Sequence, residues 1–306
     1  MGLFSLRAFL FLASVFSLSI AVLALPSNSR EPDTQWIYKS ISGKDLKMDV
    51  FLPMGFAKAE KKFPTIVIFH GGSWAEGESN WHWPDCTYWS KRGMVAVSVD
   101  YRLKNRDQVQ VPLACVKDAK SAIRFLRSNS SRLKVDPNRI VAMGDSAGGQ
   151  LASATATLTH PKTNDDAYDL SISCVPQLVV LTCPWFKTSP DMCPPKHLKV
   201  GVPPFITFAG GADTAIQVSE MIEFHQALKE KRVDSELYVG SKGKHGFCNG
   251  RNPNNPFFYW SVELTDRFLV KHSILPVASK PMDFEEFGQN KKGVSKLTET
   301  GFQAYL

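Results

Sequence analysis

The sequence predicts an α/β fold in which a mostly parallel sheet is covered by helices on both faces. Short apolar runs alternate with amphipathic helical segments along the chain, and this alternation is typical of such folds. Several runs are apolar throughout, as expected for strands that are buried on both faces. The chain has 306 residues, of which 43% are hydrophobic and 21% are charged, and these values fit one large globular domain better than two.

The first two strands are expected at residues 36–42 and 46–52, which alternate in polarity as an antiparallel pair near a sheet edge does. Further strands are expected at residues 65–69, 94–99, 139–144, 177–182, 204–209 and 236–240. Helices are expected at residues 112–128, 146–158, 218–231 and 256–272. After Pro276 the sequence becomes polar and loses its periodicity. We therefore predict a domain over residues 30–275, followed by a loosely docked polar extension over residues 276–306.

The N-terminal segment, residues 1–24, is predicted to be a secretory signal peptide. One basic residue, Arg7, precedes an almost wholly apolar run from residue 8 to residue 25, and small residues lead up to Ala24. This run is at the lower limit of length for spanning a bilayer, so an uncleaved membrane anchor is the alternative. We expect a secreted or periplasmic protein that has no membrane attachment after cleavage.

Six cysteines follow the predicted signal peptide, at positions 86, 115, 174, 183, 193 and 248. An oxidising compartment permits disulfides among them, and the candidate pairs are Cys183 with Cys193 and Cys86 with Cys115. The alternative is buried free thiols, because a domain of this size does not need covalent cross-links. The cysteines do not have metal-ligand spacing, so neither a metal nor a cofactor is predicted.

The net charge of +7 at pH 7 is spread along the chain. Lysines and arginines gather at residues 58–62 and 291–296, but acidic residues and turn formers surround both groups. One interpretation is a solvated basic surface, and the other is attraction to an acidic polymer or surface. No nucleic-acid-binding motif accompanies the charge, so we expect no nucleic-acid partner.

The segment GDSAG at residues 144–148 predicts a nucleophile elbow, because it lies between an expected strand and an expected helix. In such an elbow the turn is so tight that the serine is strained and exposed, and only small residues fit beside it. Ser146 is therefore the candidate nucleophile. A serine hydroxyl is a poor nucleophile until a base accepts its proton, so the elbow requires such a base nearby.

Two residues that follow later strands are expected to complete a catalytic triad with Ser146. His245 lies just after the last expected strand, and its neutral imidazole would accept the serine proton and pass it to the leaving alcohol. Asp213 follows the strand expected at residues 204–209, and its carboxylate would orient the imidazole. The other histidines do not lie in the loop after that last strand. The chain order serine, aspartate, histidine is that of the α/β-hydrolase fold, which we predict here.

A second motif, HGG at residues 70–72, follows an expected strand and predicts an oxyanion hole. The backbone N–H of Ala147 and those of Gly71 and Gly72 are expected to bind the carbonyl oxygen as it gains negative charge. Glycine suits this position because the absent side chain lets the backbone approach the substrate. His70 is expected to brace the loop by hydrogen bonding.

Large aromatic residues are dense after the HGG motif, and two of them, Trp74 and Trp81, are candidate substrate contacts. Their rings could form a wall that binds an acyl group or the apolar face of a sugar. The alternative for both is packing in the core. For Tyr88 and Trp89, core contacts of the following helix are the favoured interpretation.

The chain resembles the α/β-hydrolase esterases of the hormone-sensitive-lipase type, and more closely the secreted bacterial esterases grouped with bifunctional feruloyl and acetyl-xylan esterases. The likeness covers about residues 36–272. It is carried by KMDVFLP (47–53), HGGSW (70–74), SVDYRL (98–103), DAKSAIRFLR (118–127) and HGF (245–247). The resemblance implies the same triad and oxyanion residues, and an acetyl or feruloyl ester as substrate. The chain departs from the lipase-type pattern at Ser73, where a third glycine is common, and has no insertion of the size of a lid, which argues against long-chain lipids.

The sequence therefore predicts a secreted serine esterase that hydrolyses short-chain acyl esters through an acyl-enzyme, with a small ester or an acylated carbohydrate as substrate. One alternative is a serine peptidase of the prolyl-oligopeptidase type, but those enzymes normally carry a propeller domain for which this chain has no room. Another is a catalytically inactive ligand-binding protein on the same fold. Such proteins usually lose the serine or the histidine, and both are present here.

Overall fold

The computed structural model describes residues 29–165, 169–252, 254–278 and 302–305. The predicted signal peptide lies outside these ranges, as does most of the predicted C-terminal extension. The strands are β1 (Thr34–Ile41), β2 (Lys44–Phe51), β3 (Phe63–Phe69), β4 (Val95–Val99), β5 (Val135–Asp145), β6 (Leu178–Thr182), β7 (Phe205–Gly210), β8 (Ser235–Gly240) and β9 (Phe302–Tyr305). The helices are α1 (Trp83–Lys91), α2 (Lys104–Asp107), α3 (Leu113–Ser128), α4 (Ala147–Thr157), α5 (Val218–Glu230) and α6 (Pro256–Lys271), with short 3₁₀ turns between some of them.

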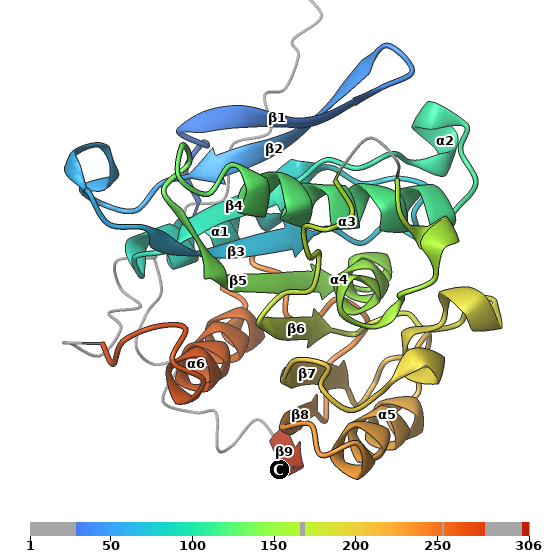
Figure 1. Cartoon of the computed structure of the whole chain (residues 1–306). Helices are drawn as coiled ribbons and strands as arrows, with labels where there is room; N and C mark the ends of the chain where they lie inside the picture. Colours follow the sequence, from blue (N-terminus) through green and yellow to red (C-terminus); the bar gives the residue numbers. More distant parts are fainter. Residues whose placement is uncertain (1–28, 166–168, 253, 279–301, 306) are drawn as a thin grey trace, which may run out of the picture.

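The nine described strands form one sheet in the order β1-β2-β4-β3-β5-β6-β7-β8-β9 (Figure 1). Neighbouring strands are parallel from β4 through β8, while β1, β2 and β9 run antiparallel to the strands beside them. Every residue of β3, β4 and β6 is buried, in line with their continuous apolar sequences. The predicted α/β fold with a mostly parallel sheet is confirmed.

The helices cover the sheet and bury their apolar sides against it. In Figure 1, α3 and α4 lie in front of the central strands, and the two helices also contact each other. The helix α1 packs on β2 and β4, α5 packs on β7 and β8, and α6 contacts β7. The helix expected to follow the aromatic segment is α1, which already begins within that segment because Pro84 suits the first turn of a helix.

The strand register brings the carboxyl ends of the central strands to one edge of the sheet. Phe69 at the end of β3 pairs with Gly144 of β5, and Asp145 pairs with Thr182 at the end of β6. The loops that follow β3, β5, β7 and β8 therefore start near one another. This edge is where ligands bind in open α/β sheets, and the predicted site residues follow these strands.

The strand expected at residues 236–240 is β8, but it is not the last one, because β9 follows it and was not expected. The C-terminal residues Phe302–Tyr305 pair antiparallel with β8, with Tyr305 opposite Leu237. An edge strand such as β8 presents unpaired N–H and C=O groups, and a short segment can pair with them whatever its own hydrophobic pattern. The predicted extension thus contributes four residues to the sheet.

All six cysteines are buried free thiols, so the candidate pairs Cys183–Cys193 and Cys86–Cys115 are both wrong. Two of the thiols donate to backbone carbonyl oxygens, Cys115 to that of Arg102 at 3.1 Å and Cys174 to that of Thr155 at 3.7 Å. The large core makes cross-links unnecessary for stability. The alternative of free thiols is the one that the structure bears out.

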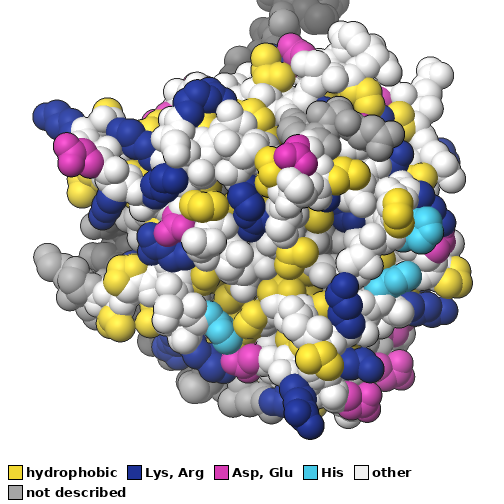
Figure 2. Space-filling view, viewed as in Figure 1, with side chains coloured by type: hydrophobic (Ala, Val, Ile, Leu, Met, Phe, Trp, Pro, Cys, Tyr) yellow, Lys and Arg dark blue, Asp and Glu magenta, His cyan; other side chains and the backbone are white. Residues whose placement is uncertain are grey.

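The basic side chains are dispersed on the face of the molecule that Figure 2 shows. Figure 2 shows Lys and Arg scattered across one face with Asp and Glu between them, and hydrophobic side chains gathered near its centre. This distribution fits a solvated basic surface on that face. None of the helices in the described part of the chain has both the length and the apolar character needed to span a membrane.

Candidate active site

Ser146 occupies a sharp turn between the end of β5 and the start of α4. Its backbone has φ 50° and ψ −116°, a conformation that is strained for a residue with a side chain. The turn demands glycine on both sides. A Cβ on Gly144 would lie 2.2 Å from the carbonyl oxygen of Gly148, and one on Gly148 would lie 1.9 Å from that of Phe69. The GDSAG segment therefore forms the predicted nucleophile elbow.

The structure brings the three predicted triad residues together. His245 Nε2 lies 2.9 Å from Ser146 Oγ, and His245 Nδ1 lies 2.8 Å from Asp213 Oδ2. Asp213 is buried, whereas the His245 side chain is 35% exposed and can meet a substrate from solvent. With Nδ1 donating to the carboxylate, Nε2 is the atom that can accept the serine proton.

Asp213 is held as a carboxylate by its surroundings. Burial raises its pKa, but the hydrogen bond from His245 and those from the backbone N–H groups of Ala215 and Ile216 outweigh this effect, and the pKa is lowered. The two N–H groups donate to Oδ1 at 2.8 and 3.1 Å, which leaves Oδ2 for the histidine. The carboxylate is therefore both charged and fixed in orientation.

The two loops that carry Asp213 and His245 pack backbone against backbone. A Cβ on Gly210, at the end of β7, would lie 2.4 Å from the carbonyl oxygen of Gly243, which follows β8. A Cβ on Gly211 would lie 2.8 Å from the Cα and from the carbonyl oxygen of Ser241. Glycines at these positions let the acid and the base approach each other from neighbouring parallel strands.

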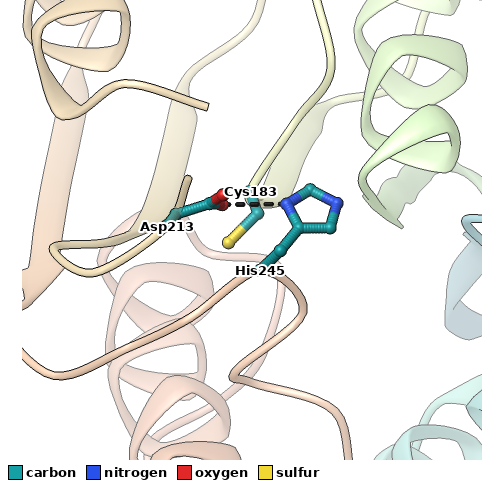
Figure 3. A group of neighbouring side chains, drawn as sticks. All are labelled: Cys183, Asp213 and His245. Carbon is teal, nitrogen blue, oxygen red and sulfur yellow. Dashed lines mark hydrogen bonds and ion pairs between the residues drawn. The ribbon is translucent and has the colours of Figure 1, made fainter. Parts of the chain in front are cut away.

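A cysteine that the sequence analysis did not assign to the site, Cys183, lies beside the Asp213–His245 hydrogen bond (Figure 3). It follows β6, is almost fully buried and has a positive φ of 45°. Its sulfur, a carboxylate oxygen of Asp213 and a ring nitrogen of His245 all lie within 4.8 Å of one another. Burial raises the pKa of the Cys183 thiol to about 12, so the thiol stays protonated beside the Asp213 carboxylate.

These three side chains are the group among the described residues that could hold a metal ion. Thiolate and imidazole are ligands that soft divalent metals favour. Asp213 and His245 already satisfy each other, however, and His245 also faces Ser146. The arrangement is thus accounted for by the triad. The one signal in the sequence for Cys183 was its position directly after a strand of the parallel sheet.

The HGG loop at residues 70–72 lies beside the elbow and is braced as predicted. The His70 ring donates from Nδ1 to the carbonyl oxygen of Gly71 at 2.8 Å, and the Tyr101 hydroxyl donates to the carbonyl oxygen of His70 at 2.6 Å. The rings of His70 and Tyr101 stack with centroids 4.3 Å apart. Burial lowers the pKa of His70 to about 4, so this histidine is neutral at physiological pH.

The three predicted oxyanion-hole residues lie around the nucleophile. Ala147 is the first residue of α4 and is fully buried. A Cβ on Gly71 would lie 2.7 Å from Asp145 Oδ2, and one on Gly72, whose φ is 99°, would lie 2.1 Å from the carbonyl oxygen of Glu76. Only glycine fits at either position of the loop. The role of these backbone N–H groups in binding an oxyanion stays a prediction.

Comparison with known proteins places this geometry in a family. The BD-FAE family model matches residues 48–177 of the chain. Esterase 2 of Thermogutta terrifontis, in a structure phosphorylated by paraoxon, is 33% identical and aligns with a TM-score of 0.76, and the match covers 80% of this chain and 96% of that one. The chain belongs to the α/β-hydrolase esterases.

Curated relatives of this esterase include Carboxylesterase NlhH of Mycobacterium tuberculosis, which is 35% identical over 98 residues. That match covers 32% of this chain and 30% of NlhH. Endo-1,4-beta-xylanase B of Butyrivibrio fibrisolvens is 28% identical over 193 residues, or 56% of this chain and 30% of the xylanase. The chain thus spans less than a third of the length of either curated relative, whereas it spans nearly all of the solved esterase 2.

The two tryptophans predicted to contact substrate differ in exposure. Trp74 is only 9% exposed and packs in the hydrophobic core of the esterase. Trp81 is partly exposed, meets the ring of His70 edge-on at 6.0 Å between centroids, and has the guanidinium of Arg251 4.6 Å from its ring centre. Substrate contact by either residue stays a prediction, and Trp81 has the larger accessible surface for it.

Tyr88 and Trp89 are 2% and 0% exposed and pack in the core from α1. The favoured interpretation of these two residues as core contacts of the helix is confirmed. The aromatic segment is therefore divided between the interior and the surface. Its first part adjoins the HGG loop, and its second part anchors α1 on the sheet.

Proposed function

We propose that this chain is a secreted serine esterase that hydrolyses short-chain acyl esters through an acyl-enzyme intermediate. The observation that carries the proposal is the continuous hydrogen-bond path from Ser146 Oγ through His245 to Asp213, with steps of 2.9 and 2.8 Å, at a nucleophile elbow. Secretion is supported by the signal-peptide pattern of residues 1–24.

The reaction proceeds in two halves. In the first, Ser146 Oγ attacks the ester carbonyl as His245 Nε2 takes the hydroxyl proton, and the negative oxygen is bound by backbone N–H groups of Gly71, Gly72 and Ala147. The tetrahedral intermediate collapses, the imidazolium gives its proton to the alcohol, and the alcohol leaves. In the second half, water repeats the attack on the acyl-enzyme and the acid is released. Asp213 stabilises the imidazolium in both halves.

The proposed substrate is an acetyl or feruloyl ester, including such groups on a polysaccharide. Structures of Thermogutta terrifontis esterase 2 have propionate or butyrate bound, and both are short-chain carboxylates. The BD-FAE match and the similarity to a xylanase support a carbohydrate-linked ester. The partly exposed ring of Trp81 offers an aromatic surface for an aryl group or a sugar face near the HGG loop.

Hydrolysis of p-nitrophenyl acetate, butyrate and octanoate by the mature protein tests the proposal, with Ser146→Ala beside it. We expect turnover of acetate and butyrate, weaker turnover of octanoate, and loss of turnover in the variant. Release of acetate from acetylated xylan and of ferulate from methyl ferulate then distinguishes the two acyl groups. Folded wild-type protein with no turnover of any ester, or an active Ser146→Ala variant, would show the proposal to be wrong.

A further inference from the structure

A hydrogen-bonded network of three charged side chains adjoins the nucleophile elbow, and the triad mechanism does not use it. His82, at the end of the 3₁₀ turn Ser79–His82, is only 5% exposed. Its Nδ1 lies 2.9 Å from Oδ2 of Asp85 in α1, and its Nε2 lies 2.8 Å from Oδ1 of Asp145 at the end of β5. Asp145 directly precedes Ser146 in the sequence. This network therefore joins α1 to the residue before the nucleophile.

Both ring nitrogens of His82 face carboxylate oxygens, and a neutral imidazole carries only one N–H. Only the imidazolium can donate in both directions. Burial lowers the pKa of His82, but the hydrogen bonds and charges of Asp145 and Asp85 outweigh burial and raise the pKa to about 10. His82 is thus a buried cation at neutral pH.

The second oxygen of Asp145 faces the HGG loop. A Cβ on Gly71 would lie 2.7 Å from Asp145 Oδ2, so the carboxylate packs directly on the backbone of Gly71. Burial raises the pKa of Asp145, but the hydrogen bond from His82 and the positive charge of its ring outweigh burial and lower the pKa overall. Asp145 therefore connects His82 to the loop whose backbone is expected to bind the oxyanion.

The charge of Asp145 also bears on the reaction. A carboxylate beside Ser146 repels an oxyanion that forms on the same side of the elbow, and the repulsion is strong where water is excluded. The imidazolium of His82, at 2.8 Å from the carboxylate, offsets this charge. Asp85 holds the imidazolium from its far side, away from Asp145.

We propose that His82 is a positioning residue for ester hydrolysis. As a fixed imidazolium it holds Asp145, and through Asp145 the HGG loop, in the geometry that stabilises the oxyanion. Its positive charge also offsets the carboxylate charge next to the nucleophile. The inference rests on the proposed function, because it assumes that Ser146 is the nucleophile. His82 itself does not touch the reacting atoms.

The kinetic test compares the wild type with His82→Gln, Asp145→Asn and the double variant on p-nitrophenyl butyrate. We expect His82→Gln to lower kcat by roughly 10- to 100-fold, at most the loss of one oxyanion donor, with little change in KM. The double variant should recover part of this loss, because two neutral amides can hydrogen-bond each other and the carboxylate next to the nucleophile is gone, although Asp85 keeps its charge. A double-mutant cycle measures the coupling between the two sites.

Inhibition by a short alkyl trifluoromethyl ketone provides a readout that a merely structural role would not move. The ketone forms a tetrahedral adduct with the nucleophilic serine, so its affinity reports how well the oxyanion is stabilised. Its inhibition constant should rise in His82→Gln by about the factor by which kcat/KM falls. A variant that only unfolds in part would lose active enzyme while the remaining enzyme kept its inhibitor affinity.

The matched control is His225→Gln, which alters another buried histidine, in α5, whose Nδ1 contacts Ser235 Oγ at 2.9 Å. It should leave kcat within about twofold of the wild type. If His82→Gln does not fold, Asp85→Asn decides, since it removes one partner of His82 without altering Asp145. A fall in kcat and in ketone affinity in that variant supports the proposal, and unchanged values overturn it.

The proposal is overturned if folded His82→Gln keeps kcat and ketone affinity within about twofold of the wild type while Ser146→Ala is inactive. An active Ser146→Ala variant would instead show that the proposed function fails. The two failures are therefore distinguishable in one set of assays.

Discussion

Gly148 in the first turn of α4 lies against Phe69 at the end of β3, so closely that a Cβ on Gly148 would be 1.9 Å from the Phe69 carbonyl oxygen. The contact presses the elbow helix onto the strand that leads into the HGG loop. Ser146 and the loop expected to bind the oxyanion are thus placed by one backbone-to-backbone contact, and the distance between them cannot relax without moving α4 or β3.

Replacing Gly148 by alanine should therefore damage both stability and catalysis. The new methyl group forces the backbone of α4 away from β3, and such overpacking costs about 1–3 kcal/mol. Thermal unfolding and hydrolysis of p-nitrophenyl butyrate would measure the two effects. Gly43→Ala is the control: Gly43 has a φ of 73° but no atom within 4 Å of a built Cβ, so only backbone strain is added. A Gly148→Ala variant as stable and active as the control would contradict the steric argument.

The thiol of Cys183 should contribute to catalysis through Asp213. Cys183→Ala removes a protonated thiol whose sulfur lies within 4.8 Å of an Asp213 carboxylate oxygen, and we expect kcat to fall by roughly three- to tenfold, the range for one ordinary hydrogen bond. Cys183→Ser retains a donor and should keep most of the activity. Steady-state kinetics of both variants check this, with Cys193→Ala as a control at a buried cysteine outside the triad. Equal activity in the alanine and serine variants would exclude the hydrogen bond as the cause.

The buried imidazolium of His82 predicts a specific dependence of stability on pH. Its pKa is about 10 in the folded protein and near 6.5 when unfolded. The stability that its charge contributes is therefore fully present below pH 6.5 and is lost as the pH rises through about 10. Asp85 of α1 and Asp145 of β5 face this ring, and the nearby His70 is neutral.

Thermal melts of the wild type and His82→Gln between about pH 6 and about pH 10.5 measure this contribution. The difference in Tm should change steadily over that range, with the wild type losing stability relative to the variant as the solution becomes alkaline. A difference that stays constant across the range would mean that His82 does not lose its proton there.

The sequence was sufficient to predict that Ser146, Asp213 and His245 come together, because each of them carries a local signal. Ser146 lies in a motif that needs a strand before it and a helix after it, and both were recognisable from hydrophobic pattern. Asp213 and His245 each follow a strand of a parallel sheet, whose carboxyl ends meet at one edge. The order serine, aspartate, histidine along the sequence then left few other candidates for the acid and the base.

His82, Cys183 and β9 lacked such signals. The partner of His82 on the elbow, Asp145, is 63 positions away, and nothing in the pattern around His82 indicates that its ring is buried between two carboxylates. Cys183 offered only its place after a strand, and the free state of the cysteines depends on where each thiol points in the core. Pairing of β9 with β8 is decided by an open sheet edge and not by the sequence of β9 itself.

Ser146 and His245 are 99 positions apart, and the sequence between them contains three of the parallel strands, β6, β7 and β8. The hydrogen bond between them forms only after β5, β6, β7 and β8 have found their register, and contacts of large sequence separation are slow to form. During refolding, helical signal should therefore return before esterase activity does. The recovery of esterase activity therefore reports when the long-range pairing of β5 through β8 is complete.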